Sequence, residues 1–433
     1  MKRRSMIIVA LLCVLWVTPV SARNKDTVVL PTDVTQARGG CALVGIEGSY
    51  ASDVTEAVNR VNEIRLEACQ NGYPNPQDST KVLTMADYVP VQWSSDLEYI
   101  ARIRAAEATI LTEHARPNGV SWGDLTSPGG IGSFSEVLAW QSWTGTLVDA
   151  IDNWYGEKNT WVSGGNGVTG HYTSMINPSV RYIGVATFNS NYGAWRSSSA
   201  GKFSTKEGLD TTAGAALDNC IQTIEVQQSK LSAPYIQEAI TDDEDMDWYF
   251  DDMDNVSTET ATIRVGDQKK YELLMDVNYD SDKAKVAVID PITWTTSNPE
   301  VATVDAYGAV QFCGAGTVTI TAASSAGTVA SVTCSVSENV KKTKIKSITS
   351  GKKQFKIKWK KVKGNGYQIQ YSPDPDFRKK TKIKKITKAN TTSITIKRLK
   401  SKKYYYVRVR SIKKVKGTKY YSDWSNMWVV RTR

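Results

Sequence analysis

The helical period in the hydrophobic pattern of this chain disappears near residue 258, and this change divides the chain into two kinds of structure. Before this point some segments have apolar residues every three or four positions, which is typical of one face of a helix. The clearest run is Val54, Ala57, Val58, Val61, Ile64 and Ala68. After it, short alternating runs separated by glycines, as in 301–304, 309–312 and 317–320, are typical of antiparallel strands. We therefore expect a multidomain chain, with an α+β part followed by two all-β sandwiches.

The α+β part contains several elements that the pattern locates. A first helix begins after Ser52, a second spans about 95–114 and a third about 147–157. Residues 181–188 alternate like a strand. Residues 23–50 lack a clear period and are interpreted as irregular. Helices and strands mixed without regular alternation favour a layered α+β structure.

The first residues have the pattern of a secretory signal peptide. Positions 2–4 are basic, 6–17 form an apolar run, and 20–22 supply the small residues of a cleavage site. The apolar run, of about 12 residues, is too short to anchor the chain in a bilayer. The expectation is a secreted chain without a transmembrane anchor, because no later stretch is apolar enough to form one.

Cysteines raise the question of disulfides. Those that follow the predicted signal peptide are Cys41, Cys69, Cys220, Cys313 and Cys334. Pairs are expected in an oxidising compartment, and an odd number leaves one thiol free. Cys313 with Cys334 is the favoured bridge, Cys41 with Cys69 is a second candidate, and Cys220 competes for either partner. No Cys-x-x-Cys occurs, which argues against a zinc site built from cysteines.

Charge is strongly segregated along the sequence. Residues 341–433 contain 31 Lys and Arg against three acids, a formal charge of +28, so the other residues carry −18 of the total of +10. Dense lysine attracts polyanions, and its point charges suit diffuse attraction more than shaped recognition. Because the chain is expected outside the cell, the predicted partners are anionic cell-wall polymers or acidic glycans rather than nucleic acid. A merely soluble, charged β domain is the alternative.

Residues 242–255 form the opposite extreme, with eight acids in fourteen positions. They lack the spacing and the turn glycine of an EF-hand calcium loop. The segment is interpreted as a solvated acidic linker, with a docking strip for the basic tail as the alternative.

The only two histidines, His114 and His171, lie in one part of the chain, and each is flanked by turn-forming residues. Between them, Glu136 precedes an apolar run that must be buried, and Glu157 follows Trp154 by three residues on a helix. Imidazole suits metal binding and proton transfer near neutral pH. Each histidine is expected on a loop at the end of an element, where functional groups are commonly displayed. These four side chains predict one cleft.

A series of short motifs surrounds these residues. They are Asn62 and Arg65, Trp93 to Leu97, His114 with Arg116, Asn118 and Gly119, Glu136, Trp154 with Glu157, Gly170 to Thr173, and Ile176 to Pro178. In this order and spacing they resemble the CAP superfamily, the cysteine-rich secretory, antigen 5 and pathogenesis-related proteins, in its extracellular bacterial form. The resemblance covers about residues 52–190.

This resemblance implies an α-β-α sandwich with a large open cleft, where His114, Glu136, Glu157 and His171 meet as the family's tetrad. It also implies a divalent cation, often zinc (Zn2+), with His114 and His171 as ligands. Ser174-Met175 departs from the Gln-Val that is common in eukaryotic members. Sterol binding is therefore not carried over, and a small lipid or peptide remains a candidate ligand for the cleft.

Two further resemblances cover the β part. The motifs that carry them are Trp294 to Asp305, Gly314 to Thr321, Trp359, Leu399 with Tyr405, and Tyr421 to Ser425. The first two resemble a group 2 bacterial Ig-like domain. The others are similar to a fibronectin type III domain, in which Trp359 is the core tryptophan and Tyr405 belongs to the tyrosine corner.

The expected organisation is a signal peptide at 1–22, an extension at 23–51, a CAP domain at 52–205, a connecting segment with the acidic linker at 206–257, an Ig-like domain at 258–337 and a basic fibronectin-like domain at 341–433.

The predicted function is ligand binding in the His/Glu cleft of a secreted protein, attached to the wall of a Gram-positive-type bacterium through its tail. One alternative is a metal-dependent hydrolase of peptide or wall material, with His114 and His171 as ligands and Glu136 or Glu157 as general base. The other is a structural adhesin with an inactive cleft. Binding is favoured over catalysis.

Overall fold

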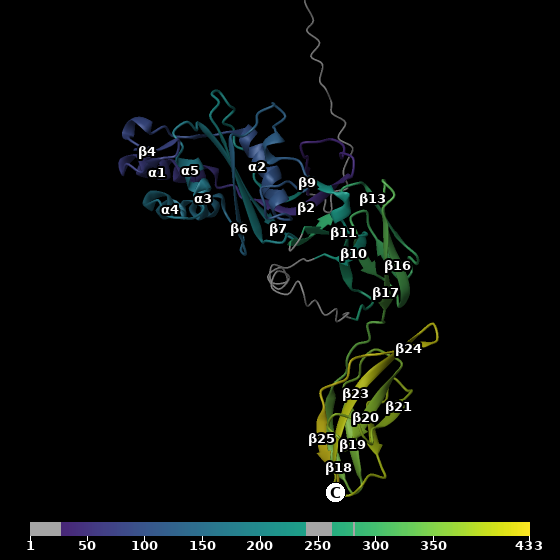
Figure 1. Ribbon diagram of the computed structural model, residues 1–433. Coiled ribbons are helices and arrows are strands. Elements are labelled where there is room, and N and C mark those ends of the chain that lie inside the picture. Colours follow the sequence, from purple (N-terminus) through teal and green to yellow (C-terminus); the bar gives the residue numbers. More distant parts are fainter. Residues whose placement is uncertain (1–26, 240–261, 280–281) are drawn as a thin grey trace, which may run out of the picture.

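The computed structural model describes residues 27–239, 262–279 and 282–433 and arranges them as three bodies in a row (Figure 1). The first body combines helices and strands, and the other two are built from strands. This confirms the multidomain organisation expected from the sequence. The predicted signal peptide at 1–22 and the acidic segment at 242–255 lie outside the described residues.

The first body contains the helices predicted from periodicity. The helices are α1 (Val54–Gln70), α2 (Ser95–Ala108), α3 (Leu147–Tyr155), α4 (Lys158–Ser163) and α5 (Gly170–Ile176). The strands are β1 (Val28–Leu30), β2 (Cys41–Tyr50), β3 (Pro74–Asn75), β4 (Asp78–Val82), β5 (Gln92–Trp93), β6 (Ser135–Gln141), β7 (Tyr182–Ser190), β8 (Ser197–Ser204) and β9 (Leu217–Gln227). The predicted helices are α1, α2 and α3, and the predicted strand at 181–188 is β7. α2 ends at Ala108, well before His114.

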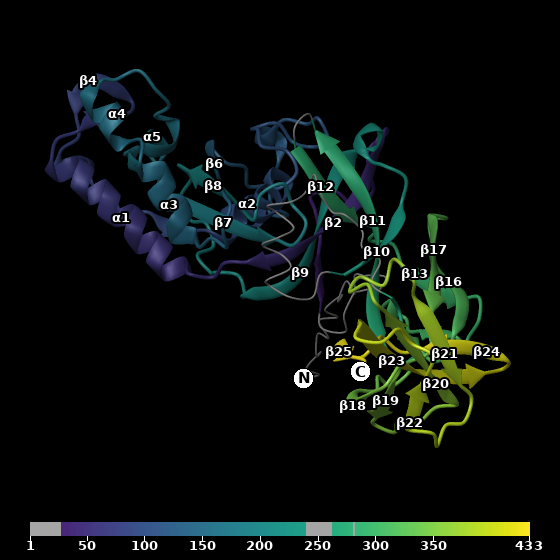
Figure 2. The same cartoon turned by 90° about the horizontal axis from the view of Figure 1, so that it is seen from below.

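Helices cover both faces of the central sheet of this body (Figure 2). α2 packs on β7 and β8, whereas α3 and α5 pack on β6 and also contact α1. The side chains of β6 show the two faces: Val137 and Ala139 belong to the core that includes α1 and α3, and Leu138 belongs to the core that includes α2. Because side chains alternate along a strand, this is an α-β-α sandwich.

α2 approaches β7 closely at Gly184. A Cβ atom at this position would lie 2.3 Å from the backbone nitrogen of Glu98 and 2.4 Å from the carbonyl carbon of Leu97. Only a residue without a side chain admits this contact. Gly184 is also the cross-strand partner of Lys202 in β8, so the close approach lies beside a residue of the site described below.

The interpretation of residues 23–50 as irregular is wrong. β2 pairs along its length with β9 and, near its C-terminal end, with β7. Its glycines hide the strand because they interrupt the alternation of large side chains, yet the packing requires them. A Cβ at Gly45 would lie 2.3 Å from Ile221, and one at Gly48 would lie 2.2 Å from the carbonyl oxygen of Asn189.

The second body is a sandwich of antiparallel strands, as predicted. Its strands are β10 (Tyr235–Glu238), β11 (Gln268–Tyr279), β12 (Asp282–Ala287), β13 (Ile292–Thr296), β14 (Ala302–Val304), β15 (Ala309–Phe312), β16 (Gly316–Ser324) and β17 (Val329–Val336). β13, β16 and β17 form one sheet, and β11, β14 and β15 belong to another. Phe312 and Ile320 lie in the core between them.

A continuous sheet joins the first body to the second. β12 pairs with β11 and also, through Ala287 and Gly45, with β2. Next to this joint the hydroxyl of Tyr192 donates to Glu272 over 2.8 Å in a buried position. Strands outside the predicted range 52–205 therefore extend the sheet of the first body.

The predicted disulfides are not formed, because each cysteine within the described residues is free. Cys334 is buried in the second body, where its sulfur lies 3.4 Å from the hydroxyl of Tyr271, whereas Cys313 is exposed. Cys41 begins β2 and Cys69 lies in the last turn of α1. The expectations of a Cys313–Cys334 bridge and a Cys41–Cys69 bridge are therefore wrong.

The third body has the two sheets expected of a fibronectin type III sandwich. Its strands are β18 (Ile345–Gly351), β19 (Gln354–Trp359), β20 (Gly366–Ser372), β21 (Lys382–Ile386), β22 (Ser393–Ile396), β23 (Tyr404–Val415), β24 (Thr418–Tyr421) and β25 (Trp428–Arg431). One sheet has the order β18-β19-β22, and the other has the order β21-β20-β23-β24, with β25 also on β23. Trp359 is in the core, and the Tyr405 hydroxyl accepts the backbone N–H of Lys400 over 3.1 Å, as the resemblance implies.

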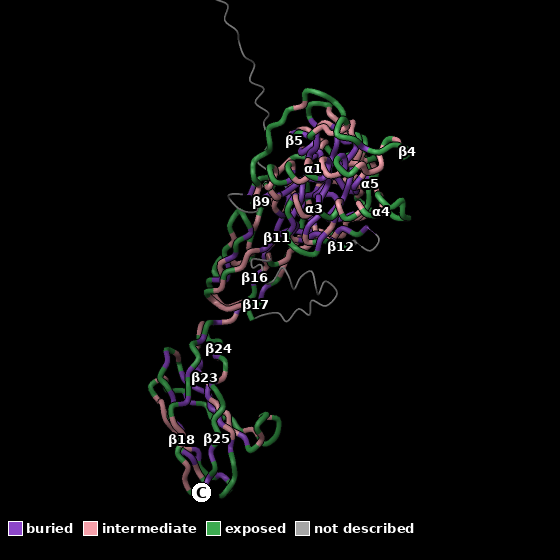
Figure 3. Tube along the Cα trace, turned by 90° about the vertical axis from the view of Figure 1, so that its left-hand side faces the viewer, coloured by how far each residue is buried: buried purple, intermediate pink, exposed green. Residues whose placement is uncertain are grey.

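Burial alternates along β19 and most of β23, and exposed positions are spread over the third body (Figure 3). Lys356 and Lys358 of β19 occupy such exposed positions, and Phe355 and Ile357 lie inside. The lysines thus belong to the surface of the sandwich and not to its core. Among the helices of residues 27–239, 262–279 and 282–433, none has the length and apolar character needed to cross a membrane.

Candidate functional site

The four side chains that the sequence singles out come from four segments of the first body. Glu136 is the second residue of β6, and Glu157 lies between α3 and α4. His114 lies in an irregular segment after α2, as expected. His171 is in the first turn of α5 and not in a loop, which corrects the prediction, and α5 packs on β6. The structure arranges them as two His–Glu pairs.

The first pair joins His114 to Glu136. The Nδ1 atom of His114 lies 2.9 Å from Oε1 of Glu136. Arg104 of α2 supports both partners, since its Nε donates to Glu136 Oε2 over 2.8 Å and its Nη2 donates to the backbone carbonyl of His114 over 3.4 Å. The side chain of Glu136 is fully buried, whereas that of His114 is 53% exposed. The imidazole of His114 is therefore exposed to solvent, while the carboxylate that holds it is buried.

Lys202 is a further partner of Glu136. The register of β6 and β8 places the two residues opposite each other, and Lys202 Nζ donates to Glu136 Oε2 over 2.6 Å. The ammonium group also lies 4.7 Å from the ring centre of Trp122. Lys202 and Arg104 are both fully buried, so two cations flank one carboxylate inside the protein. A buried carboxylate is stable only with such partners.

These contacts determine the charge of Glu136. Burial by itself would raise its pKa, but hydrogen bonds from His114 and Arg104, together with the charges of Arg104 and Lys202, outweigh burial and hold the pKa well below its usual value. Burial lowers the pKa of Lys202 to about 8, although Glu136 opposes the change. Glu136 accepts hydrogen bonds from four nitrogen atoms. It is therefore unsuited to be a general base, and its role is to position His114.

The second pair joins His171 to Glu157. His171 Nδ1 lies 2.6 Å from Glu157 Oε1. The other carboxylate oxygen accepts the backbone N–H groups of His171 and Tyr172 over 3.0 and 3.1 Å. Glu157 thus holds both the imidazole and the first turn of the helix that carries it. This satisfies N–H groups that the start of a helix leaves without partners.

Both pairs favour the same tautomer of the imidazole, with the proton on Nδ1. When Nδ1 donates to a carboxylate, the lone pair of the imidazole resides on Nε2, which can then bind a metal ion, accept a proton or accept a hydrogen bond from a ligand. The His171 side chain is 25% exposed, so it too reaches solvent. Each pair therefore offers one acceptor nitrogen.

The residues fit a resident zinc ion poorly. Catalytic zinc sites have three protein ligands and structural sites have four. Within the described residues, no group of three or more His, Cys, Asp or Glu side chains is placed to hold a metal ion. Both glutamates already hold an imidazole. No step of the function proposed below depends on a metal ion.

Buried charges that were not predicted from the sequence support the first pair. Glu107 of α2 accepts hydrogen bonds from Arg104 over 2.8 Å and from Arg116 over 2.7 Å, and Arg116 also donates to Asp33 over 2.7 Å. Lys202 with Glu136, and Arg38 with Asp33 and Glu225, extend these contacts to four cations and four anions in one balanced network. The signal in the sequence is Arg104 on the apolar side of α2, with Glu107 one turn later.

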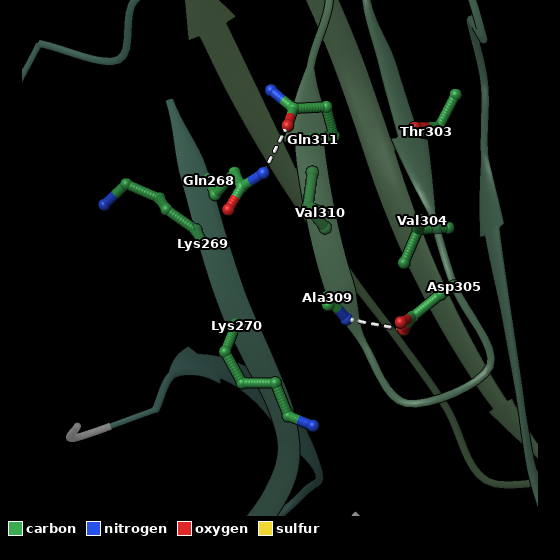
Figure 4. Close-up of a pocket in the computed structure, with 9 residues that line it drawn as sticks. All are labelled: Gln268, Lys269, Lys270, Thr303, Val304, Asp305, Ala309, Val310 and Gln311. Atoms are coloured by element: carbon green, nitrogen blue, oxygen red, sulfur yellow. Dashed lines mark hydrogen bonds between the residues drawn. The ribbon is translucent and has the colours of Figure 1, made fainter. Parts of the chain in front are cut away.

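A separate hollow of about 500 Å³ lies on the second body, between β11, β14 and β15 (Figure 4). Gln268 and Gln311 hydrogen-bond across it over 2.6 Å, and Asp305 accepts the backbone N–H of Ala309 over 2.9 Å. None of the four His and Glu residues of the site lines this hollow.

Comparisons with protein families identify two parts of the chain. Residues 58–197 match the model of the cysteine-rich secretory protein family, CAP. All four residues of the two His–Glu pairs lie in this range. Residues 290–327 match the model of the intimin immunoglobulin-like domain, which agrees with the Ig-like sandwich of the second body.

Solved structures with similarity to the chain include fibronectin type III domains. That of the human collagen alpha-1(XX) chain is 13% identical, with 22% of this chain and 85% of that chain covered and a TM-score of 0.18. That of human contactin 1 is 16% identical, with 21% and 76% covered and a TM-score of 0.17. No curated protein matches the chain.

Proposed function

We propose that this chain, which carries a CAP domain at residues 58–197 followed by Ig-like and fibronectin-like sandwiches, is an extracellular binding protein that attaches to anionic cell-wall polymers. Proteins of the CAP family are generally secreted. In this proposal the two oriented imidazoles of the CAP domain engage a ligand. The third body holds the protein on the polymer.

The observation that carries the proposal is the separation of charge between the bodies. The third body has 31 Lys and Arg and only three acids. Two of these acids are already engaged: Asp374 accepts the backbone N–H groups of Arg378 and Lys379, and Asp423 pairs with Arg264 of the second body. The surface lysines are therefore largely uncompensated, and their field attracts polyanions.

The chemistry of the two His–Glu pairs favours binding over catalysis. Each carboxylate is committed to holding its imidazole, and Glu136 is in addition neutralised by Arg104 and Lys202. What remains available is Nε2 of His114 and of His171. Two acceptor nitrogens on rings that reach solvent suit a ligand that donates hydrogen bonds or carries an exchangeable cation.

A hydrolase is the second candidate, and the contact of 2.6 Å between His171 and Glu157 favours it. An imidazole oriented by a carboxylate is the arrangement of a general base. In such an enzyme His171 would accept the proton through Nε2, with Glu157 as the orienting group. Glu136 does not serve as the base because of its cation partners.

Attachment is tested by co-sedimentation of the full chain with isolated bacterial walls that contain teichoic acid. We expect binding at low salt and release by about 0.5 M salt, because contacts between exposed charges are screened as the Debye length falls. Binding that survives this salt unchanged would contradict the proposal. The His171→Ala variant should bind walls as the wild type does, and hydrolysis of wall material that this variant loses would establish the enzyme instead.

A further inference from the structure

We propose that the third body contains a discrete site for phosphate groups of a sugar or polyol polymer, in a hollow at one end of its sandwich. The hollow has a volume of about 410 Å³, and five cations line it: Lys380, Lys382, Arg398, Lys400 and Lys403. The inference rests on the attachment to polyanions proposed above, and it adds a place and a ligand class.

The five cations lack compensation. The residues that line the hollow include no Asp or Glu. In the part of the chain that the structure describes, none of these cations has an ion-pair partner, and each is exposed. Like charges around one hollow repel each other, and a bound anion relieves this repulsion. An anionic ligand is therefore favoured here beyond the general attraction of the domain.

The backbone fixes the loop that displays three of the cations. Next to Arg398, the N–H of Leu399 donates to the carbonyl of Lys353 over 2.9 Å. The N–H of Lys400 donates to the Tyr405 hydroxyl over 3.1 Å. Thr432 exchanges hydrogen bonds with Lys403, accepting its N–H over 3.1 Å and donating its own N–H to the Lys403 carbonyl over 3.0 Å. The backbone from which these charges extend is thus ordered before a ligand arrives, which lowers the cost of ordering on binding.

Two of the cations sit at backbone positions that side chains rarely adopt. Lys380 has a φ of 53° and Arg398 a φ of 60°, both in the left-handed region. These residues come from different loops, one between β20 and β21 and the other between β22 and β23. The sandwich brings them to the same hollow.

The floor of the hollow is apolar. Leu399 and Tyr405 are buried there, and Tyr371 is half-buried. A floor of this kind accommodates the carbon face of a sugar or polyol, and a volume of about 410 Å³ falls within the range of small-molecule sites. Lysine ammonium groups bind phosphate as point charges. A unit that combines an apolar face with phosphate groups matches both the floor and the rim.

The hollow of Figure 4 provides a contrast. It contains Lys269 and Lys270, but Asp305 lines it too, and Lys269 pairs with Glu238. Its cations are thus partly compensated by carboxylates. An excess of positive charge distinguishes the hollow of the third body from it.

The test measures binding of the full chain to poly(glycerol phosphate) with a matched pair of triple variants. The site variant is Lys380→Gln, Lys400→Gln and Lys403→Gln. The control variant is Lys346→Gln, Lys356→Gln and Lys358→Gln, which removes the same charge from exposed positions of β18 and β19. We expect the site variant to lose about tenfold or more in affinity and the control about twofold, with a salt dependence lowered chiefly in the site variant.

Each outcome decides a separate point. Equal losses in the two variants would show diffuse attraction and overturn the site, while attachment to polyanions would stand. If the wild type binds neither poly(glycerol phosphate) nor isolated walls, the proposed function is overturned as well. Equally strong binding of polygalacturonate, with the same loss in the site variant, would replace phosphate by carboxylate as the ligand group and overturn the proposed class. All six substitutions are at exposed positions, so thermal unfolding of both variants should match the wild type.

Discussion

Lys202 Nζ donates a hydrogen bond of 2.6 Å to Oε2 of Glu136, and both side chains are fully buried. The two residues are cross-strand partners on β6 and β8. Through this contact Lys202 helps to fix the charge of the glutamate that orients His114. The first His–Glu pair therefore depends on a buried ion network, whereas the second depends on backbone N–H groups at the start of α5.

The first prediction concerns Lys202→Met. Removing one partner of a buried ion pair leaves the other charge poorly compensated, so we expect a loss of about 3 kcal/mol in the free energy of unfolding. Chemical denaturation of the full chain, followed through the transition of the first body, measures it. Lys206→Met, at an exposed position after β8, serves as the control and should change little. A loss no larger than that of Lys206→Met would show that the pair with Glu136 contributes no net stability.

The second prediction concerns the pH dependence contributed by Asp33. Burial raises the pKa of this carboxyl, but hydrogen bonds and charge from Arg116 outweigh burial and lower it from 3.8 to about 2. The unfolded chain then binds the proton more readily than the folded one. The stabilisation, about 2 kcal/mol, is present above the unfolded pKa and is lost as the pH falls through 3.8 toward 2.

Unfolding of wild type and Asp33→Asn at a series of pH values between about 5 and 2 measures this contribution. The difference in stability between the two proteins should shrink as the pH falls. Asp124→Asn, at an exposed position, controls for the loss of an aspartate in general. A difference that stays constant across this range would mean that Asp33 has the same pKa in both states.

The sequence predicts those parts of the fold whose signal is local. α1, α2 and α3 follow from the spacing of their apolar residues, because that spacing reports one buried face. β2 is missed because its glycines, which close contacts with Ile221 and Asn189 require, break the alternation of large side chains. These glycines are needed because strands that are distant in the sequence, β7 and β9, pack closely against β2.

The same reasoning applies to the candidate site. The sequence singles out His114, Glu136, Glu157 and His171, because rare residue types and short motifs mark them. The structure joins them as two pairs, and their meeting in one cleft stays a prediction. The sequence does not identify Lys202, since a lysine in a serine-rich strand has the character of a surface residue until the register places Glu136 opposite it. The predicted disulfides are wrong for a related reason: spacing along the chain does not report that Cys334 points into a core while Cys313 faces solvent.

The third prediction concerns the contact between α2 and β7. A Cβ at Gly184 would lie 2.3 Å from the backbone of Glu98, and neither backbone can move away easily. We therefore expect Gly184→Ala to lower the stability of the first body by about 3 kcal/mol, at the upper end for overpacking. Gly170→Ala, where a Cβ meets nothing within 4 Å, is the matched control. Thermal unfolding of both variants measures the difference, and equal midpoints would contradict the close approach of α2.

The last prediction concerns divalent cations and the two pairs. His114 and His171 offer at most two protein ligands to a zinc ion, so an ion bound at the pairs should exchange readily, and a chelator should remove it without unfolding the protein. His171→Ala should abolish binding in a calorimetric titration. Glu157→Gln keeps the imidazole but weakens its orientation, and loss of such a supporting carboxylate typically costs about 10- to 100-fold in metal affinity. Glu56→Gln, at an exposed position of α1, should bind as the wild type does. Zinc binding that persists in His171→Ala would place the ion away from the two pairs, and they would then act on an organic ligand alone.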